Sequence, residues 1–449
     1  MEGADFGDKR LSNRLLKMVE QILKAPDKSF PSLFDEAELE AAYRFFSNDA
    51  VTPERILDPH RQATLKRMDD EGIALVIHDT TTMAFDPDGM RSGLGRNRSK
   101  GQAFFAHASL AVAADGSRRP LGALELMGFT RNDDKTTNER DRWLEKMDDV
   151  EGHVQKHAKR TSVIHLADRE ADDFQILTAL SSQASRFVIR MKHNRRLSAN
   201  TASGAQWLRQ AAESECKVQA RRSVHLSARP AEGRSPVQRK VHPTRSEREA
   251  HLNIGATTVL IERPGSQRAE YPEAAMLNVV RVWEPNPPSD QEPVEWLLLT
   301  TEPVGTEEDI LRIVDWYRSR WVIEEFFKAL KTGCSYEKRQ ITTYQGLMNV
   351  LATFMPVAYH LLLLRSVSRD NSQIPAAAVL SPTQLRVLAV EPRAALPACP
   401  TARDAFLSIA RLGGHLKRNG EPGWIVLSRG YETLLTLTAG WRLARSEKM

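Results

Sequence analysis

The sequence predicts a mixed α/β fold with helical segments towards both ends. Two apolar runs without alternation, residues 73–77 and 162–167, are typical of strands buried on both faces. Segments before and after them show the three-to-four-residue apolar spacing of helices instead. The chain has 449 residues, of which 41% are hydrophobic, and this is enough for two or three domains. We therefore expect a sheet-containing centre between two helical parts.

The part of the chain before about residue 71 is expected to form three helices. Apolar residues recur at helical spacing in residues 11–22, and a second helix is expected over residues 35–46. The third is expected over residues 53–68, with Pro53 in its first turn and Thr52 as the N-cap. Lys and Arg side chains are interspersed, so this module could bind DNA phosphates. The alternative is a helical cap packed on the next domain.

The centre of the chain is expected to alternate strands with one long helix. Strands over residues 104–113 and 120–129 are joined by Asp115-Gly116, which is a hairpin turn signal. A charged helix over residues 138–159 precedes the second apolar run, and another strand is expected over residues 186–191.

Residues from about 194 to 295 differ from their surroundings, because strand-like runs recur there without long helical periodicity. Their first half is basic through Arg195, Arg196, Arg221, Arg222, Arg239 and Lys240. We interpret this part as a β-rich insertion, after which a core strand resumes over residues 296–300. An apolar helix is then expected over residues 349–367, followed by a connector to about residue 401 and a last helix around residues 406–411.

Residues 315–333, which read DWYRSRWVIEEFFKALKTG, are predicted to form one helix that ends at its glycine. At about 100° per residue, Tyr317, Arg320, Glu324 and Lys331 fall within an arc of roughly 60°. One carboxylate, two cations and a phenol therefore share one stripe. The simpler interpretation is a solvated face with an Arg320–Glu324 pair, worth a few tenths of a kcal/mol.

Both apolar runs are followed by a carboxylate, Asp79 after the first and Asp168 after the second. The end of a central strand is where α/β sheets place ligands and chemistry. Together with Glu324, these carboxylates would repel one another unless a cation were present. Oxygen-only ligands favour Mg²⁺ or Mn²⁺, and two such ions could activate a water or a 3′-hydroxyl towards a phosphodiester. For either Asp alone, a turn or capping role is the alternative.

Charge and cysteine content restrict the class further. The net charge of +5 and the pI of about 9.0 permit a polyanionic partner. Cys216, Cys334 and Cys399 have no CxxC spacing, so neither a disulfide framework nor a zinc site is expected. We expect no signal peptide, and no stretch that approaches the roughly 20 apolar residues of a membrane span. A reducing cytoplasm fits this composition.

With these residues in place, the sequence resembles the DDE transposases of bacterial cut-and-paste elements, specifically the IS-four group that includes the transposase of Tn-five. Tyr317, Arg320, Glu324 and Lys331 reproduce the Y-(2)-R-(3)-E-(6)-K signature of that group. Further matches are AYRFF at 42–46, DTT at 79–81, DREAD at 168–172, WLLLTTEP at 296–303 and IARLGG at 409–414. The resemblance spans nearly the whole chain.

The resemblance implies a three-part architecture. A helical domain that binds DNA ends would occupy residues 1–70, and a ribonuclease-H-like catalytic domain residues 71–365, with the β-rich insertion at about 194–295. A helical C-terminal dimerisation domain would occupy residues 366–449.

The resemblance also implies the roles of individual residues. Asp79, Asp168 and Glu324 would be the catalytic metal ligands for Mg²⁺, with Mn²⁺ as a substitute. The implied DNA contacts are Tyr317, Arg320, Lys331, Arg190, Lys192 and Trp296. Of these, Trp296 would stack on a flipped base while a DNA hairpin forms.

The implied activity is cut-and-paste transposition. A homodimer would pair two terminal inverted repeats in a synaptic complex, cleave double-stranded DNA through a hairpin and join the 3′ ends to target DNA. This would take place in the bacterial cytoplasm, on the nucleoid, without a membrane. Two alternatives stay open at this point: a ribonuclease-H-like nuclease that does not transpose, and a catalytically inactive DNA-binding inhibitor.

Overall fold

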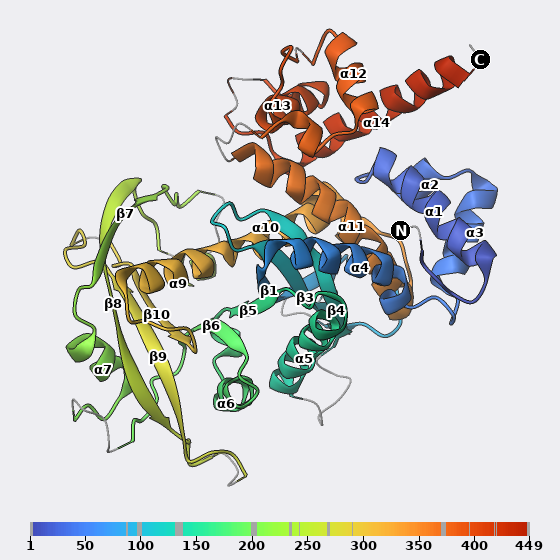
Figure 1. Cartoon of the computed structure of the whole chain (residues 1–449). Coiled ribbons are helices and arrows are strands. Elements are labelled where there is room, and N and C mark those ends of the chain that lie inside the picture. The colour runs from blue at the N-terminus through green and yellow to red at the C-terminus, as the bar shows by residue number, and fades with distance from the viewer. Residues whose placement is uncertain are drawn as a thin grey trace. The chain divides into compact units, whose positions relative to one another are not determined.

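The computed structural model describes residues 3–86, 89–96, 101–130, 138–198, 204–232, 236–241, 243–266, 270–289, 291–369, 374–394, 396–416, 418 and 420–446. The chain divides into two compact units. Unit 1 comprises Met1–Asn138, Lys146–Ser162 and Trp321–Met449, and unit 2 comprises Glu139–Glu145 and Val163–Arg320. Both units contain helices and strands, as the predicted α/β class requires (Figure 1).

The N-terminal part of unit 1 contains the helices α1 (Lys9–Lys24), α2 (Phe30–Leu33), α3 (Glu36–Phe46) and α4 (Pro53–Glu71). Three of them confirm the expected helices, and the short α2 is an addition. The side chains of Asp8, Asp35 and Thr52 accept hydrogen bonds from backbone N–H groups in the first turns of α1, α3 and α4. These caps satisfy donors that a helix start leaves open.

The sheet of unit 1 contains β1 (Ile73–Phe85), β2 (Gly95–Arg96), β3 (Gln102–Ala113) and β4 (Pro120–Phe129). All three other strands pair antiparallel with β3. β1 is longer than the sequence suggests, because its ladder with β3 continues through the polar residues 78–82. Asp79 lies inside β1, with Ala108 as its Cα partner. The prediction that this strand ends before Asp79 is therefore wrong, because pairing with β3 overrides the polar composition.

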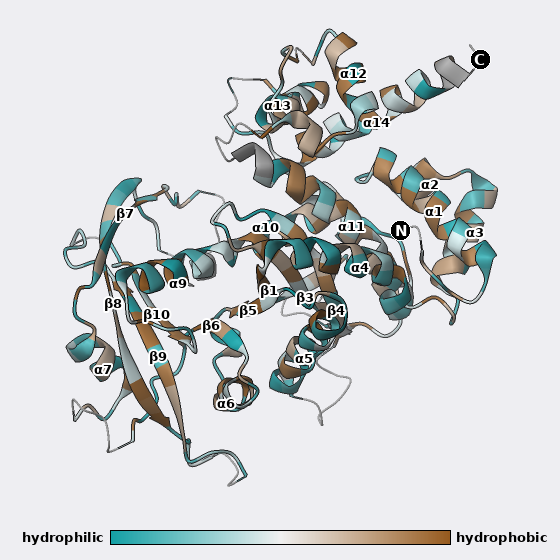
Figure 2. Ribbon diagram, viewed as in Figure 1, coloured by the Kyte–Doolittle hydropathy of each residue, from teal (hydrophilic) through white to brown (hydrophobic). Residues whose placement is uncertain are grey.

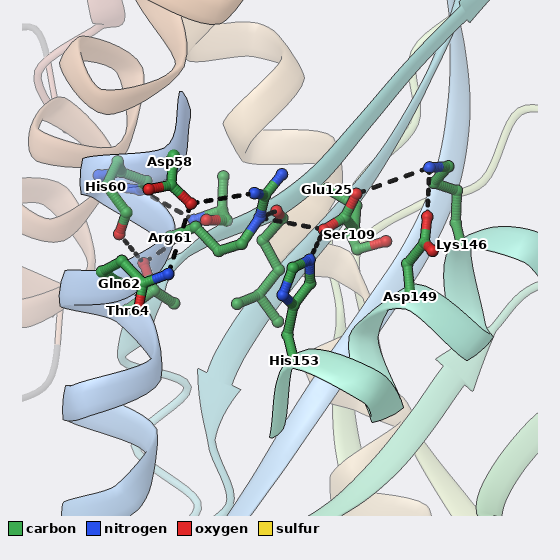
Figure 3. Close-up of polar contacts among 12 residues, drawn as sticks. Asp58, His60, Arg61, Gln62, Thr64, Ser109, Glu125, Lys146, Asp149 and His153 are labelled. Atoms are coloured by element: carbon green, nitrogen blue, oxygen red, sulfur yellow. Dashed lines mark hydrogen bonds and ion pairs between the residues drawn. The ribbon is translucent and has the colours of Figure 1, made fainter. Parts of the chain in front are cut away.

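A buried carboxylate ties two helices to β4 within unit 1. Glu125 on β4 is 4% exposed. Its Oε1 lies 3.1 Å from Arg61 Nε of α4 and 3.2 Å from His153 Nε2, and its Oε2 lies 3.6 Å from Lys146 Nζ. Lys146 and His153 belong to α5 (Glu139–His157), and Figure 3 shows the side chains of Arg61, Lys146 and His153 converging on Glu125. Such partners are what a buried charge needs to be tolerated.

The helix α11 (Tyr344–Arg369) corrects one expectation from the sequence. Its segment Tyr344–Ser366 is long and apolar enough to cross a membrane by length and composition, so the statement that no such stretch exists is wrong. However, 83% of an apolar 18-residue window within this segment is buried inside the protein. α11 packs against α4, β4, α10 and α13 within unit 1, and it is therefore a core helix.

The C-terminal part of unit 1 contains more helix than expected. It comprises the 3₁₀ turn η4 (Ala376–Ala378), α12 (Pro382–Val390), α13 (Ala402–Leu412) and α14 (Trp424–Ser446). α13 confirms the last expected helix. The expectation of a connector without helix up to residue 401 is wrong, because α12 lies within that segment. α14 is a helix beyond those expected. α14 packs against α12, α13 and α1.

The described residues of unit 2 include six strands of the sheet: β5 (Ser162–Ala167, of which Ser162 is assigned to unit 1), β6 (Arg186–Arg190), β7 (Ala220–Leu226), β8 (Arg248–Glu262), β9 (Ala274–Trp283) and β10 (Glu295–Thr300). Their order is β5-β6-β10-β9-β8-β7. β5 and β6 run parallel, and every other neighbouring pair is antiparallel. The strands of the expected β-rich insertion therefore extend this sheet (Figure 1).

The helices of unit 2 are α6 (Phe174–Ser182), α7 (Leu208–Glu215), α8 (Pro236–Val241) and α9 (Glu307–Ser319). α9 begins with a capping box, in which the Thr306 side chain and the Asp309 side chain each bond the backbone N–H of the other residue. α9 packs against β6, β7, β8 and β9. This places the last turn of α9, with Tyr317, beside the sheet.

Candidate active site

The predicted helix over residues 315–333 is divided into three parts in the structure. They are the end of α9 at Ser319, α10 (Trp321–Lys328) and a π-helical segment, Ala329–Gly333. The boundary between unit 2 and unit 1 also falls between Arg320 and Trp321.

Two hydrogen bonds explain the division. The Arg320 N–H bonds the Tyr317 carbonyl, three residues back, and the Cys334 N–H bonds the Ala329 carbonyl, five residues back. Tighter and wider turns both depart from 100° per residue. The prediction of one regular helix with a 60° arc is therefore wrong, although the residues on both sides of Arg320 are helical and the π-helical segment ends at Gly333, as predicted for the helix.

In unit 1, the structure places the elements that carry Asp79 and Glu324 against each other. Asp79 lies in β1, Glu324 lies in the first turn of α10, and α10 packs on β1. Both side chains are half-buried. Asp79 Oδ1 accepts a hydrogen bond of 2.8 Å from the Thr80 N–H, which orients the carboxyl group. Two of the three predicted ligands thus stand on neighbouring elements.

Lys331 is tied to the same strand. Its Nζ donates to Thr81 Oγ1 at 2.9 Å and to the Thr82 carbonyl at 2.6 Å, and it lies 3.8 Å from Glu337 Oε1. Glu337 in turn accepts a hydrogen bond from the Ala84 N–H of β1. Burial lowers the pKa of the Lys331 ammonium, and Glu337 opposes this shift. The π-helical segment thus places one cation two to three residues beyond Asp79 on β1.

In unit 2, Asp168 directly follows β5 and caps the 3₁₀ turn Arg169–Ala171. Its Oδ1 accepts a hydrogen bond of 2.8 Å from the Glu170 N–H. The side chain is half-buried. Asp168 therefore has the capping role that was the alternative to metal binding. The cap uses only Oδ1, so it is compatible with a ligand role for Oδ2.

Tyr317 stands at the centre of a charged group in unit 2. Its side chain is buried, with 6% exposure. Burial raises the pKa of the Tyr317 phenol, the Arg320 and Arg190 guanidiniums oppose that shift, and the Asp168 carboxylate adds to it. Burial likewise lowers the pKa of Arg190, and Tyr317 opposes this change. The phenol therefore stays protonated near neutral pH and can donate a hydrogen bond.

Trp296 on β10 also contacts this group. Its ring centroid lies 5.9 Å from that of Tyr317 in an edge-to-face arrangement, and the side chain is half-buried. One part of the indole is therefore packed and another part is accessible. Trp321, which follows Arg320, is 51% exposed, and Lys328 Nζ lies 5.5 Å from its ring centroid.

An ion pair between Asp172 and Arg195, which was not predicted from the sequence, holds in place the segment that contains Lys192. Asp172 is 1% exposed and accepts hydrogen bonds from the Lys192 and His193 N–H groups and, at 2.5 Å, from Arg195. Arg195 also donates to the Asp172 carbonyl at 2.8 Å. Asp172 ends the DREAD motif, and that motif was the available signal. The pair fixes residues 192–195 against the turn that follows Asp168.

The three predicted metal ligands are distributed over both units, Asp79 and Glu324 in unit 1 and Asp168 in unit 2. Within the described ranges, no group of three His, Cys, Asp or Glu side chains lies close enough together to hold a metal ion. The metal triad therefore stays a prediction, as do the DNA contacts and the domain bounds at residues 70 and 365.

Comparison with known proteins identifies the family. The model described as "Transposase DNA-binding" matches residues 1–51, and the model described as "Transposase DDE domain" matches residues 71–354. Among solved structures, the chain is similar to a cryo-EM structure of the piggyBac transposase synaptic complex with hairpin DNA. That similarity has a TM-score of 0.35 at 10% identity, and it covers 81% of this chain and 68% of that chain.

The DDE model covers more than half of the chain and includes Asp79, Asp168 and Glu324. The match also confirms the ribonuclease-H-like α/β class predicted from the sequence. The chain therefore belongs to the family of transposases that carry a DDE domain.

Proposed function

We propose that this protein is a cut-and-paste DNA transposase of the IS-four group, similar to the transposase of Tn-five. It binds terminal inverted repeats, pairs two ends as a homodimer, cleaves them through a hairpin and joins the 3′ ends to target DNA. The observation that carries the proposal is the spacing of Tyr317, Arg320, Glu324 and Lys331 inside the matched DDE domain. We place this activity in the bacterial cytoplasm, on the nucleoid.

Asp79, Asp168 and Glu324 are the residues that would hold divalent ions. All three offer carboxylate oxygens, the donor set that Mg²⁺ and Mn²⁺ prefer, and all three side chains are half-buried and so accessible to a ligand. When bound, two ions supply an activated water or 3′-hydroxyl and stabilise the leaving oxygen of the phosphodiester. Hydrogen bonds from Thr80 and Glu170 hold two of the carboxyl groups in place.

The phosphates at the cleavage site are proposed to be held by side chains of the chain itself. Arg320 and Arg190 carry positive charge beside Tyr317, and the protonated phenol can donate to a phosphate oxygen. Lys331 adds a cation close to Asp79, where its bonds to Thr81 and Thr82 fix its position. Lys192 lies on the segment that Asp172 holds.

We expect Trp296→Ala to slow hairpin formation more than the first nick. Base stacking on an aromatic side chain contributes roughly 1–3 kcal/mol, which corresponds to about a tenfold to hundredfold loss in the step that uses it. The half-buried indole has an accessible part for such stacking. The measurement is a time course on a denaturing gel that separates nicked, hairpinned and fully cleaved DNA. If both steps slow equally and the melting temperature falls, Trp296 is a packing residue instead.

Dimerisation is proposed for the C-terminal helices, and the structure shows how to test it. Deleting everything from residue 397 would remove α13 and α14, including the fully buried Ile409 and Leu427, so it would damage the core of unit 1. Leu416 and Ile425 are instead 50% and 44% exposed, and can be changed without opening the core.

We expect Leu416→Glu combined with Ile425→Glu to abolish paired-end complexes in a native gel and to retain binding of single ends. A charge placed in an apolar contact must be desolvated without a partner, and this disfavours association. Met276→Glu on β9, at 72% exposure, is the matched control and should pair ends normally. Normal pairing by the double variant would place the dimer surface elsewhere.

Two other functions are separated from this one by activity assays on DNA with the native flanking repeats. A nuclease that does not transpose would nick this DNA in Mg²⁺ but would not join its 3′ ends to a target plasmid. A DNA-binding inhibitor would bind the repeats without nicking them. Nicking followed by strand transfer supports the transposase, and the absence of either step refutes it.

A further inference from the structure

The positive charge of this chain is concentrated in one short stretch, residues 217–248, which we name the basic arm. The basic arm contains nine Lys and Arg residues and two Glu residues, a formal charge of +7, whereas the whole chain carries only +5. The other 417 residues therefore have a net charge of −2. A charge so unevenly distributed is the electrostatic footprint of a polyanion-binding surface.

Several of the described residues of the basic arm are exposed. Its strand β7 forms the edge of the unit 2 sheet and pairs with β8. Alternate residues of β7, Arg221, Ser223 and His225, are exposed on one face. The strand is largely hydrophilic in Figure 2. The helix α8, which follows in sequence, exposes Arg239 and Lys240.

Two arginines of the basic arm are already neutralised by carboxylates. Arg222 is hydrogen-bonded to both carboxylate oxygens of Asp315, and Arg248 in the same way to Glu284. The first pair fixes β7 to α9, and the second fixes β8 to the residue that directly follows β9, so a structural role accounts for both.

Arg229 and Arg245 have no carboxylate partner among the described residues, although Arg229 Nη1 donates a long hydrogen bond of 3.4 Å to the Pro243 carbonyl. They lie opposite each other in an isolated antiparallel β-bridge: the Arg229 N–H bonds the Arg245 carbonyl at 2.8 Å, and the Arg245 N–H bonds the Arg229 carbonyl at 3.2 Å. Arg245 Nε also donates to the Ser227 carbonyl at 2.9 Å. Across the described part of the chain, no carboxylate forms an ion pair with either guanidinium.

Like charges directly opposite each other on two strands are destabilising. At Arg245, burial lowers the pKa of the guanidinium most, and the positive charges of Arg229 and Arg248 lower it further. An anion between the two guanidiniums would remove this repulsion. Guanidinium groups match phosphate in geometry and bind it through paired hydrogen bonds.

We propose that the basic arm is a binding surface for the phosphate backbone of double-stranded DNA, in which Arg229 and Arg245 together hold a phosphate. This rests on the proposed function, since it gives the transposase a further DNA-binding surface besides the N-terminal part and the candidate active site. The contact is independent of sequence, because it is made to phosphates. DNA is favoured over a lipid surface because the arm offers charge with little apolar area, Val218 being its one large apolar side chain exposed among the described residues.

The test measures the salt dependence of DNA binding by the full chain. Fluorescence anisotropy gives the dissociation constant between about 50 and 200 mM KCl for two duplexes of equal length, one with the native repeat and one of random sequence. Each phosphate contact contributes about −0.9 to the slope of log K against log [salt]. Because the two arginines share one phosphate, Arg229→Gln combined with Arg245→Gln should reduce the slope by about 1 on both duplexes.

Two variants serve as controls. Arg229→Lys combined with Arg245→Lys keeps the charges and should keep the wild-type slope, even where side-chain packing changes. Arg393→Gln removes an exposed arginine that is paired with Glu391 outside the basic arm, and it should leave the slope unchanged. Thermal melting should show that the Gln variant is folded, because removing like charges does not open the core.

An unchanged slope for the folded Gln variant would refute the proposal, and so would a change on the repeat duplex alone. If the Gln pair does not fold, the single variants Arg229→Gln and Arg245→Gln should each weaken binding to both duplexes and reduce the slope by up to about 1. The outcome is separable from the transposase proposal: wild-type protein that fails to nick its repeats refutes the latter, while a changed slope on random DNA still supports the basic arm.

Discussion

Glu324→Gln is expected to lose at least about a hundredfold in nicking rate in Mg²⁺ and to bind transposon ends as well as wild type. The change removes one proposed metal ligand, and bound ions supply several kcal/mol of transition-state stabilisation, where each 1.36 kcal/mol is tenfold in rate. DNA affinity should survive because phosphate contacts come chiefly from Lys and Arg. Folding should not suffer, since fewer negative charges face each other in the metal-free protein.

The adjacent Glu325 provides a matched control. It lies in the same helix, α10, and is likewise half-buried. Glu325→Gln removes the same charge and should nick DNA at nearly the wild-type rate, whereas Asp79→Asn and Asp168→Asn should behave like Glu324→Gln. A gel assay for nicking, together with a gel-shift assay for binding, separates the two effects. Near-normal nicking by a folded Glu324→Gln protein would end the assignment of the metal triad.

Asp172→Ala is expected to lower the free energy of unfolding by about 3–5 kcal/mol. Breaking a buried ion pair leaves the partner charge uncompensated, and Arg195 is 7% exposed. The same substitution removes the acceptor of the Lys192 and His193 N–H groups. Urea unfolding followed by circular dichroism measures the loss.

Asp173→Ala is the control for this prediction. Asp173 is the N-cap of α6 and accepts a hydrogen bond of 2.8 Å from the Gln175 N–H, so its loss should cost only about 1 kcal/mol. Equal destabilisation by the two variants would show that the Asp172–Arg195 pair contributes no more than a helix cap.

Elements with local signals could be predicted from the sequence. Strands over residues 120–129 and 162–167 have the predicted bounds, because a turn signal or a polar residue closes each apolar run. Thr52 caps α4 as expected, since the threonine hydroxyl and the following proline act within one turn. The signature residues could also be identified, because their spacing lies within a short stretch.

Features that depend on distant contacts could not be predicted. β1 continues past Asp79 because β3 pairs with it. α14 contains Gly430, which lowers helix propensity, yet a Cβ atom there would lie 1.8 Å from the Ile409 carbonyl oxygen of α13. The Asp172–Arg195 pair joins residues 23 positions apart. α12 is different, because its capping box of Ser381 and Gln384 is a local signal within the sequence.

The division of the chain into interleaved units bears on how such genes can change. Unit 1 is assembled from three stretches of the chain, and those of unit 2 lie between them. A single crossover between two related genes in the codons for residues 163–320 would therefore give a protein whose unit 1 comes from two parents, with Asp79 from one and Glu324 from the other. One crossover in this region therefore mixes two parental sequences inside a single packed core, whereas exchange of residues 163–320 as a whole requires two crossovers.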